Sequence, residues 1–268
     1  MKVVVLGSGS KGNTTYIEAG STKILIDAGI SYLQIKNRLK NQGINLDKLD
    51  AIFITHEHTD HISNLVSLLK KTTATLYIHK DTYLCANNKL KGNLSAFTTK
   101  LIKADHKYDV GQLSIVPIEL SHDTSNCLGF MVKELGIANN HSFATITDTG
   151  YVPEKYYKIL SFIKVILIES NHDEKMLLNS NRPWNLINRI LSDHGHMSNA
   201  QCVDTLKKFV SKYNKVVILG HISEECNDYE YARKFLIKAF NGTLPFELKV
   251  AYQYEELPLI DLERIIDA

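Results

Sequence analysis

The stretch Thr55-His56-Glu57-His58-Thr59-Asp60-His61 decides how the rest of the chain is interpreted. It contains three histidines and an aspartate within six residues, directly after the apolar run Ala51-Ile52-Phe53-Ile54. A short apolar run of this kind predicts a buried strand. A lone histidine is more often an ordinary core or surface residue, but this density of imidazole and carboxylate groups at a strand end predicts a metal site.

Length and composition leave the number of domains and the class of ligand open. The 268 residues suit one large domain or two small ones. Apolar residues make up 44% of the chain and charged residues 22%, which is ordinary for a globular protein with a substantial core. With 31 basic and 29 acidic residues, the total charge neither indicates nor excludes a protein that binds nucleic acid through a local basic groove.

Other features of the sequence predict a cytoplasmic protein. The residues after Met1 do not form a signal peptide, and no run reaches the ~18 apolar residues that a membrane span needs. The four cysteines show no CxxC spacing, so in a reducing compartment we expect free thiols. No internal repeat, linker or low-complexity segment stands out.

Side chains that can bind a metal recur at the ends of predicted strands. Strands are expected over 51–55, 113–120, 142–147 and 215–219, and they lead to His56, His122, Asp148 and His221. Such side chains converge when the strand ends share one edge of a sheet. Further strands are expected over 3–6, 13–19, 23–27, 75–78, 127–133, 165–168 and 246–251. Helices are expected over 31–41, from His61 to Leu69, over 80–88, after Pro153, after a capping box at Ser198 and Gln201, and from Asp228 to Ala239.

The glycine-rich loop from Gly7 to Asn13 is a separate candidate site. It superficially has the form of a dinucleotide-binding loop, but a strand follows it where that motif requires a helix, so we exclude a dinucleotide. Ser10, Asn13 and the backbone N–H groups of the loop could still contact a phosphate. Ordinary turn chemistry explains the same residues equally well.

The histidines and acids can be divided into two metal sites. His56 and His58 are two residues apart, which places both side chains on the same side of an extended backbone, and His122 could complete a three-histidine site. Asp60, His61 and His221 could form a second site, and Asp148 could bridge the two ions. Imidazole and carboxylate ligands suit zinc and manganese, and iron as well.

The pattern His56-x-His58-x-Asp60-His61, followed by single His, Asp and His positions, resembles the metallo-β-lactamase-fold hydrolases. The resemblance implies an α+β fold, a four-layer αββα sandwich with a dinuclear metal site at one sheet edge. It implies that one ion is held by His56, His58 and His122, the other by Asp60, His61 and His221, and that Asp148 bridges them. The whole chain, 1–268, is expected to be a single domain. Only 73 positions separate Asp148 from His221, so the cap domain of some RNA-processing relatives is not expected.

Several segments spread along the chain resemble one subgroup of this superfamily. Residues 7–13, 169–173, 183–185 and 190–199 look similar to the bacterial YycJ (WalJ) subgroup, which implies a 5′ to 3′ DNA exonuclease. In the tRNA 3′-processing endonucleases of the same superfamily, an acid after a strand pairs with a histidine near the scissile phosphate. By that analogy Glu169 orients His196, and Ser198 or Asn199 contacts a phosphate.

The expected reaction is hydrolysis of a phosphodiester in nucleic acid, with DNA as the predicted substrate and no membrane involved. Hydroxide attacks phosphorus while Asp60 orients it or accepts its proton. His196, held in the right tautomer by Glu169, protonates the leaving oxygen or stabilises its charge. If DNA is the substrate, contacts to its backbone require basic residues, with Lys11, Lys36, Arg38, Lys40 and Arg182 as candidates. For any one of these residues a solvated charged surface is the alternative. The alternatives are a small-molecule hydrolase of the thioesterase, lactonase or cyclic-phosphodiester kind and a non-catalytic binding module.

Overall fold

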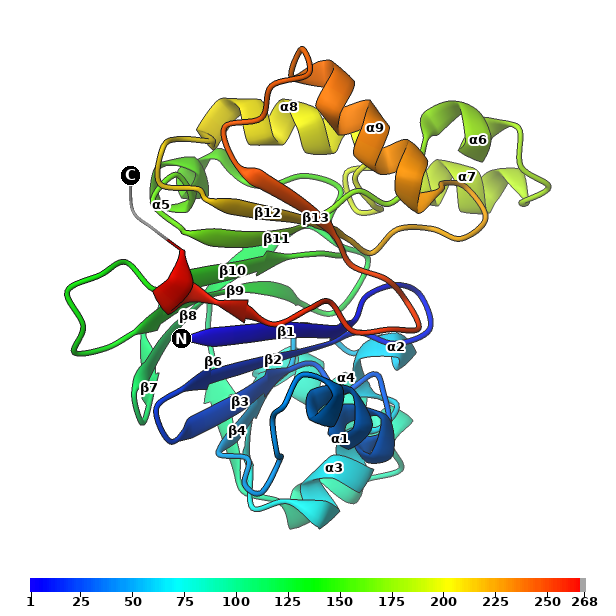
Figure 1. Ribbon diagram of the computed structural model, residues 1–268. Coiled ribbons are helices and arrows are strands. Elements are labelled where there is room, and N and C mark those ends of the chain that lie inside the picture. The colour runs from blue at the N-terminus through cyan, green and yellow to red at the C-terminus, as the bar shows by residue number, and fades with distance from the viewer. Residues whose placement is uncertain (266–268) are drawn as a thin grey trace.

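The computed structural model describes residues 1–265 and consists of two facing seven-stranded sheets, each covered on its outer side by helices (Figure 1). The predicted four-layer αββα arrangement is confirmed. Each apolar strand face is buried because the sheets pack on each other on one side and on helices on the other. Among these residues, no helix combines the length and the apolar character that crossing a bilayer requires.

The first sheet has the strand order β14-β1-β2-β3-β4-β5-β6. Its strands are β1 (Lys2–Gly7), β2 (Thr14–Ala19), β3 (Thr22–Ile26), β4 (Ala51–Phe53), β5 (Thr75–His79), β6 (Thr99–Ile102) and β14 (Ile260–Asp261). The strands from β1 to β3 are antiparallel, and those from β3 to β6 are parallel. The helices of this half are α1 (Tyr32–Asn41), α2 (Thr59–Ile62), α3 (Leu65–Lys71), α4 (Lys80–Lys89) and η1 (Asn93–Ala96).

The second sheet has the strand order β13-β12-β11-β10-β9-β8-β7. Its strands are β7 (Tyr108–Val110), β8 (Leu113–Leu120), β9 (Cys127–Glu134), β10 (Ser142–Ile146), β11 (Val165–Glu169), β12 (Val216–Gly220) and β13 (Glu247–Val250). The helices of this half are η2 (Glu154–Tyr156), α5 (Tyr157–Leu160), α6 (Glu174–Leu178), α7 (Trp184–Leu191), α8 (Asn199–Phe209) and α9 (Tyr229–Ala239). The last element, η3 (Leu262–Arg264), directly follows β14 of the first sheet.

Strand direction determines where the site forms. The strands β10 to β13 are parallel, and β8 runs the same way as β10 because each is antiparallel to β9. The carboxyl ends of β8, β10, β11 and β12 therefore lie at one edge of the second sheet. The residues at or just beyond these ends are His122, Asp148, Glu169 and His221. The first sheet contributes the segment after β4 to the same place.

The core has three apolar layers. One fills the space between the sheets, and Phe53 stacks there on Tyr77 with ring centroids 4.4 Å apart and meets Phe130 edge-on. A second lies between the first sheet and its helices and includes Ile35 and Leu39 of α1. The third lies between the second sheet and α5, α8 and α9. The two sheets are thus held together by a continuous buried interface next to the site.

The predicted elements agree with the structure except in three places. The helix expected from His61 to Leu69 is two helices, α2 and α3, since Asn64 between them has φ −108° and ψ 4° and its side chain donates to the Gly29 carbonyl. The strand expected over 51–55 ends at Phe53. The short elements β6, β7, β14, α6, α7, η1 and η3 were not predicted, and α6 and α7 project beside the second helix layer (Figure 1).

Candidate active site

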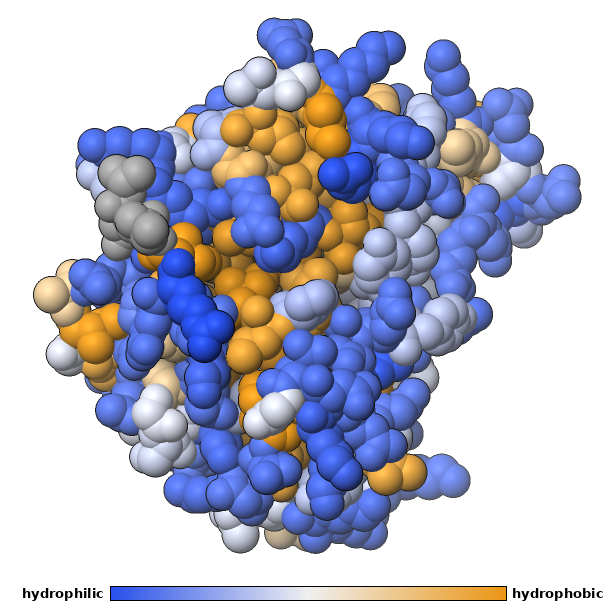
Figure 2. Space-filling model, in the orientation of Figure 1, coloured by the Kyte–Doolittle hydropathy of each residue, from blue (hydrophilic) through white to orange (hydrophobic). Residues whose placement is uncertain are grey.

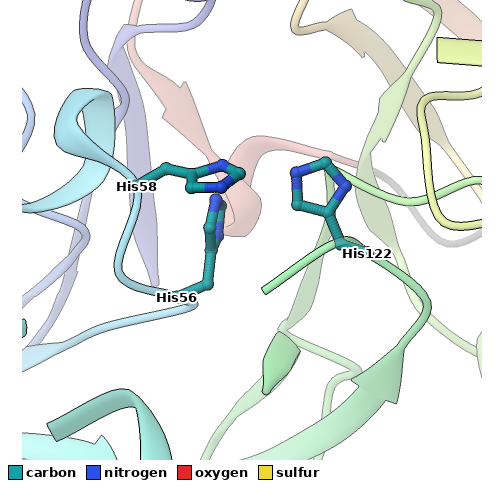
Figure 3. Close-up of side chains that lie close together, drawn as sticks. All are labelled: His56, His58 and His122. Carbon is teal, nitrogen blue, oxygen red and sulfur yellow. The ribbon is translucent and has the colours of Figure 1, made fainter. Parts of the chain in front are cut away.

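Three histidines meet at one end of the gap between the sheets. His56 and His58 come from the segment between β4 and α2, and His122 follows β8; Figure 3 shows their rings turned toward one another. One ring nitrogen from each lies within 4.8 Å of the others. The Nδ1 of His122 is 2.9 Å from the Gly195 carbonyl oxygen, which leaves its Nε2 for the centre of the group. These are the three histidines expected to share one ion.

A second group adjoins the first and contains Asp60, His61, Asp148 and His221. The Nε2 of His61 is 3.2 Å from Asp60 and 3.3 Å from Asp148. The Nε2 of His221 is 3.2 Å from the other oxygen of Asp148. The ring centroids of His56 and His61 are only 4.0 Å apart, so the two groups form one continuous cluster.

Several nitrogen and oxygen atoms that could bind a metal at the centre of the cluster make no hydrogen bond. Buried polar atoms are normally hydrogen-bonded, because leaving one unsatisfied costs about 1–3 kcal/mol. Among the described residues, four buried atoms in the two groups make no hydrogen bond: Nε2 of His56, Nε2 of His122, Oδ2 of Asp148 and Nε2 of His221. The last two have ion-pair contacts instead, those of Asp148 with His61 and His221, at 3.3 and 3.2 Å. All four belong to side chains expected to bind metal. Orphaned nitrogen and oxygen donors that converge in this way fit a divalent cation.

The protonation of the first group also suits a metal. Burial, followed by the nearby His61, lowers the pKa of His56, and burial followed by His122 lowers the pKa of His58. Burial likewise lowers the pKa of His122. Neutral imidazole is the form that binds a metal, so the site favours the ligand form of all three rings.

The second group has the opposite electrostatics. Burial opposes a charged ring at His61, but the carboxylates of Asp27, Asp60 and Asp148 outweigh it and raise its pKa well above the ordinary value. Burial also opposes a charged ring at His221, but Asp148, with Asp60 and Glu169, outweighs it and raises its pKa well above the ordinary value. The carboxylates in and behind the second group therefore favour a positive charge nearby, which either protonated histidines or a bound cation can supply.

Asp27 orients the second group from behind, and sequence reasoning did not identify it. One of its carboxylate oxygens lies 2.7 Å from Nδ1 of His61, and the other accepts from the Thr55 backbone N–H at 2.9 Å. A carboxylate behind a metal-binding histidine fixes the ring and its tautomer. Asp27 directly follows β3, so an acid at a strand end was the signal that could have revealed it.

Glu169 and His196 lie beside the second group. The Nδ1 of His196 is 2.7 Å from Oε1 of Glu169, and the same oxygen is 3.3 Å from Nδ1 of His221. Oε2 of Glu169 accepts from the backbone N–H of Thr149 at 2.9 Å. Burial raises the pKa of Glu169, but His196 and His221 outweigh it and lower the pKa to about 2. A buried carboxylate thus holds His196 with its Nε2 turned away from Glu169.

The His196 ring is packed between two histidines of the metal groups. It stacks on His221 with centroids 5.2 Å apart and an interplanar angle of 10°, and it meets His122 edge-on at 4.9 Å. The expectation that Glu169 and His196 pair close to the metal site therefore agrees with the geometry. His194, two residues earlier, has its Nδ1 3.0 Å from the Ser121 hydroxyl, outside both groups.

Four residues were expected to contact phosphate, and only Ser10 is exposed. Asn13 is buried, and its side-chain amide donates to Asp60 at 2.9 Å and to the Gly9 carbonyl at 3.0 Å. Ser198 caps α8, and its hydroxyl donates to Glu174 at 3.0 Å. Asn199 is buried between Ser170 and Asn227. The structure therefore does not support direct phosphate contact by Asn13, Ser198 and Asn199, because their polar atoms bond to other protein groups.

Arg38 is a further correction among the basic candidates. Its side chain is buried and donates to the backbone carbonyls of Leu6 and Tyr254. It ties α1 to the chain beside β1 and is not offered to a nucleic acid backbone. The DNA-contacting role considered for Arg38 is therefore wrong.

Comparisons with known proteins show the family and the fold of this chain. A family model described as the beta-lactamase superfamily domain matches residues 22–222. The chain is 33% identical to the exodeoxyribonuclease WalJ of Streptococcus pneumoniae over 237 residues, which cover 88% of this chain and 87% of the relative. It is 31% identical to the exodeoxyribonuclease YycJ of Bacillus anthracis over 85% of each chain. The metallo-beta-lactamase fold protein YhfI of Bacillus subtilis superposes with a TM-score of 0.70 over 96% of this chain and 98% of that one, at 17% identity.

Proposed function

The chain belongs to the β-lactamase superfamily, and within its YycJ/WalJ-type subgroup we propose that it acts as a metal-dependent DNA exonuclease. The observation that carries this proposal is the convergence of four orphaned donor atoms in two adjoining histidine and acid groups. Two relatives named exodeoxyribonucleases, matched over most of both chains, support DNA as the substrate. The 5′ to 3′ direction and a cytoplasmic location remain predictions.

Two divalent ions are proposed, zinc or manganese, with iron as a further candidate. His56, His58 and His122 would hold one ion, and Asp60, His61 and His221 the other. Asp148 would contact both, because its two oxygens face His61 and His221 and its Oδ2 makes no hydrogen bond to any described residue. When bound, such ions neutralise charge on phosphoryl oxygens and lower the pKa of water.

Side chains of the protein would orient the attacking water and protonate the leaving oxygen. Asp60 is fixed by the Asn13 amide and is proposed to orient the attacking water. His196 would give a proton from Nε2 to the leaving oxygen, since its Nδ1 is engaged by Glu169. Glu169 is a positioning residue, because it holds both His196 and His221 and touches no reacting atom.

A substrate panel tests the proposal. Purified protein with manganese or zinc is incubated with duplex DNA, single-stranded DNA, RNA and bis(p-nitrophenyl) phosphate, and products are resolved by length. Loss of single nucleotides from DNA ends is expected. Turnover of the small diester with DNA left intact would contradict the proposal and favour a small-molecule hydrolase on the same fold.

Two variants test the assigned roles. His196→Ala should retain its metal while the rate falls by about 10²–10⁴-fold, the usual contribution of a positioned proton donor. His106→Ala, an exposed histidine outside both groups, is the matched control and should keep the wild-type rate. Asp60→Ala should lose bound metal, measured by elemental analysis. A full rate in His196→Ala, or full metal content in Asp60→Ala, would overturn the respective role.

A further inference from the structure

A small hollow opens beside the candidate active site. It is lined by groups from both sides of the cluster, including His122, His196, Ser10 and the two arginines of the α7 region, Arg182 and Arg189. Its volume is about 110 Å³. Neither arginine belongs to the metal groups or to the Glu169–His196 pair, so the roles proposed above leave the hollow unexplained.

Helix α7 forms the outer wall of the hollow. Arg182 lies just before the helix, and Leu186, Arg189 and Ile190 follow on the same face, one and two turns later. Trp184 at the helix start is offset by about half a turn from these positions and is 63% exposed. The region of α6 and α7 at the right of Figure 2 presents mainly hydrophilic residues to the outside in this view. The hollow is thus closed on one side by a helix that the metal groups do not need.

The arginines carry unused hydrogen-bond donors. Nε of Arg189 donates to Asp123, and no described residue accepts from its two terminal nitrogens. Arg182 donates from Nε and Nη2 to Glu225, at 3.1 and 3.0 Å, which leaves Nη1 without a described partner. Asp123 also lines the hollow, so the two arginines and this aspartate together contribute one net positive charge to the lining. Guanidinium groups held in place with free N–H donors are suited to an anion with several oxygens.

The size of the hollow restricts that anion. One water needs ~10–15 Å³, and pockets that enclose a whole organic ligand measure ~300–1,000 Å³. At about 110 Å³ the hollow is too small for a nucleoside. A phosphate group fits this range, and its oxygens match the donors of two arginines and a serine hydroxyl.

The hollow lies next to His196, and this position determines whether the 5′ end or the 3′ end of a DNA strand can enter it. Water attack at the scissile phosphorus forms a P–O bond and breaks the P–O3′ bond, and the proton from His196 goes to O3′. The nucleotide that carries this O3′ therefore lies on the His196 side, where the hollow is. If nucleotides are removed from the 5′ end, the nucleotide that carries this O3′ is the terminal one. Its other phosphate is then the 5′-phosphate of the strand. A strand continuing in that direction would meet α7.

From these observations we infer that Arg182, Arg189 and Ser10 bind the terminal 5′-phosphate of the DNA strand, and that α7 acts as the stop that restricts cleavage to ends. This inference rests on the proposed exonuclease function and adds to it the chemistry of the end that is recognised. Arg182 was a candidate for general backbone contacts, and here it receives a specific ligand. Arg189 and the stop were not expected from the sequence.

The experiment compares two duplexes of one sequence, labelled at the 3′ end, that carry either a 5′-phosphate or a 5′-hydroxyl. The wild-type protein with manganese should degrade the phosphorylated end with a kcat/KM higher on the order of 10- to 100-fold, as expected for charge-assisted hydrogen bonds. In Arg189→Gln and in Arg182→Gln this ratio should fall toward one. Arg189→Lys, which keeps the charge but not the fork of donors, should give an intermediate ratio.

Arg264→Gln is the matched control. Arg264 lies in η3, its side chain is 87% exposed, and its Nε is 3.4 Å from Asp261, so it is an arginine paired with an aspartate away from the hollow. This variant should keep the wild-type ratio. Thermal melting of each variant shows whether it folds, and the wild-type comparison requires no variant at all.

The outcomes separate this inference from the function on which it rests. Equal wild-type rates on the two ends, an unchanged ratio in both arginine-to-glutamine variants, or shortening from the 3′ end would overturn the phosphate assignment while DNA hydrolysis stood. Hydrolysis of bis(p-nitrophenyl) phosphate without any loss of DNA would instead refute the exonuclease function itself.

Discussion

Three site residues, Asp27, Asp148 and His221, have φ values of 63°, 59° and 51°. Each follows a strand, and the left-handed conformation ends the strand and turns the chain at the sheet edge. Aspartate and histidine tolerate this region better than most residues, yet holding it still costs about 1–3 kcal/mol per residue. The surrounding packing maintains this conformation, and the side chains consequently face the cluster.

Asp27→Asn should weaken metal binding without unfolding the protein. Asparagine accepts the same φ, but it removes the negative charge behind His61, so we expect affinity for the second ion to fall by about 10–100-fold. A competition titration against a chromophoric chelator measures this. The control is Asp105→Asn, which also has a positive φ, 61°, but pairs with Lys155 outside both metal groups. Unchanged affinity in Asp27→Asn would show that the carboxylate does not support the ligand.

Single-residue roles were only partly predictable. The expected metal ligands are all brought together, because dense histidines and strand-end positions are visible in the sequence. Asn13 was assigned to a phosphate, although its amide in fact donates to Asp60. Which partner a polar side chain meets depends on the tertiary packing of loops, and no local pattern records it. Asp27 differs, because it directly follows β3 and its place at a strand end was visible in the sequence.

At the scale of elements, the capping box of α8 was predicted from Ser198 and Gln201, and both of its hydrogen bonds are present. The Ser198 side chain accepts from the Gln201 backbone N–H, and the Gln201 side chain accepts from the Ser198 backbone N–H. The long elements were predictable because apolar periodicity reports burial. Helix α7 was not predicted, since it has only eight residues and follows a polar stretch. This short helix nevertheless supplies the outer wall of the hollow beside His122 and His196. The sequence therefore indicated the scaffold more clearly than the element proposed to select the DNA end.

Ser198→Ala tests the reassignment of Ser198 from phosphate contact to helix cap. Loss of the cap should lower the free energy of unfolding by about 1 kcal/mol, within the usual range of 0.5–2 kcal/mol. Denaturant titration measures this change. The kcat/KM on DNA should stay close to that of the wild type, because the buried hydroxyl faces Gln201 and Glu174. A large loss of activity with unchanged stability would restore the phosphate role.

Glu57 connects the two segments that carry the first histidine group. It lies between His56 and His58, and its carboxylate accepts from the Ser125 backbone N–H and hydroxyl, both at 2.9 Å. Glu57→Ala should therefore loosen the loop that follows His122. We expect faster hydrogen exchange over 121–126 and weaker binding of the first ion, with the second ion retained. Lys89→Ala, which removes a donor to the Glu57 carbonyl and not to its carboxylate, serves as the control.

At the scale of the whole molecule, the site depends on both halves of the sandwich. The first half contributes Asp27 and the segment from His56 to His61, and the second contributes His122, Asp148, Glu169, His196 and His221. The apolar layer between the sheets, with Phe53 against Phe130, fixes the two halves relative to each other. Metal binding and the packing of the sheets should therefore stabilise each other.

Removal of metal should lower the melting temperature in a single transition. At a free metal concentration of 100 times Kd, binding stabilises the folded state by about 2.7 kcal/mol. For a chain of this size about 2–4 °C is lost per kcal/mol, so a chelator should lower the melting temperature by roughly 5–10 °C. One transition is expected with and without metal, because the sequence predicts a single domain over 1–268 and a buried apolar layer joins the two sheets of the described residues. Calorimetry measures both quantities, and a His58→Ala/His61→Ala variant should no longer respond to the chelator. Two separate transitions would contradict the single domain, and an unchanged melting temperature in the wild type would contradict the coupling of metal binding to folding.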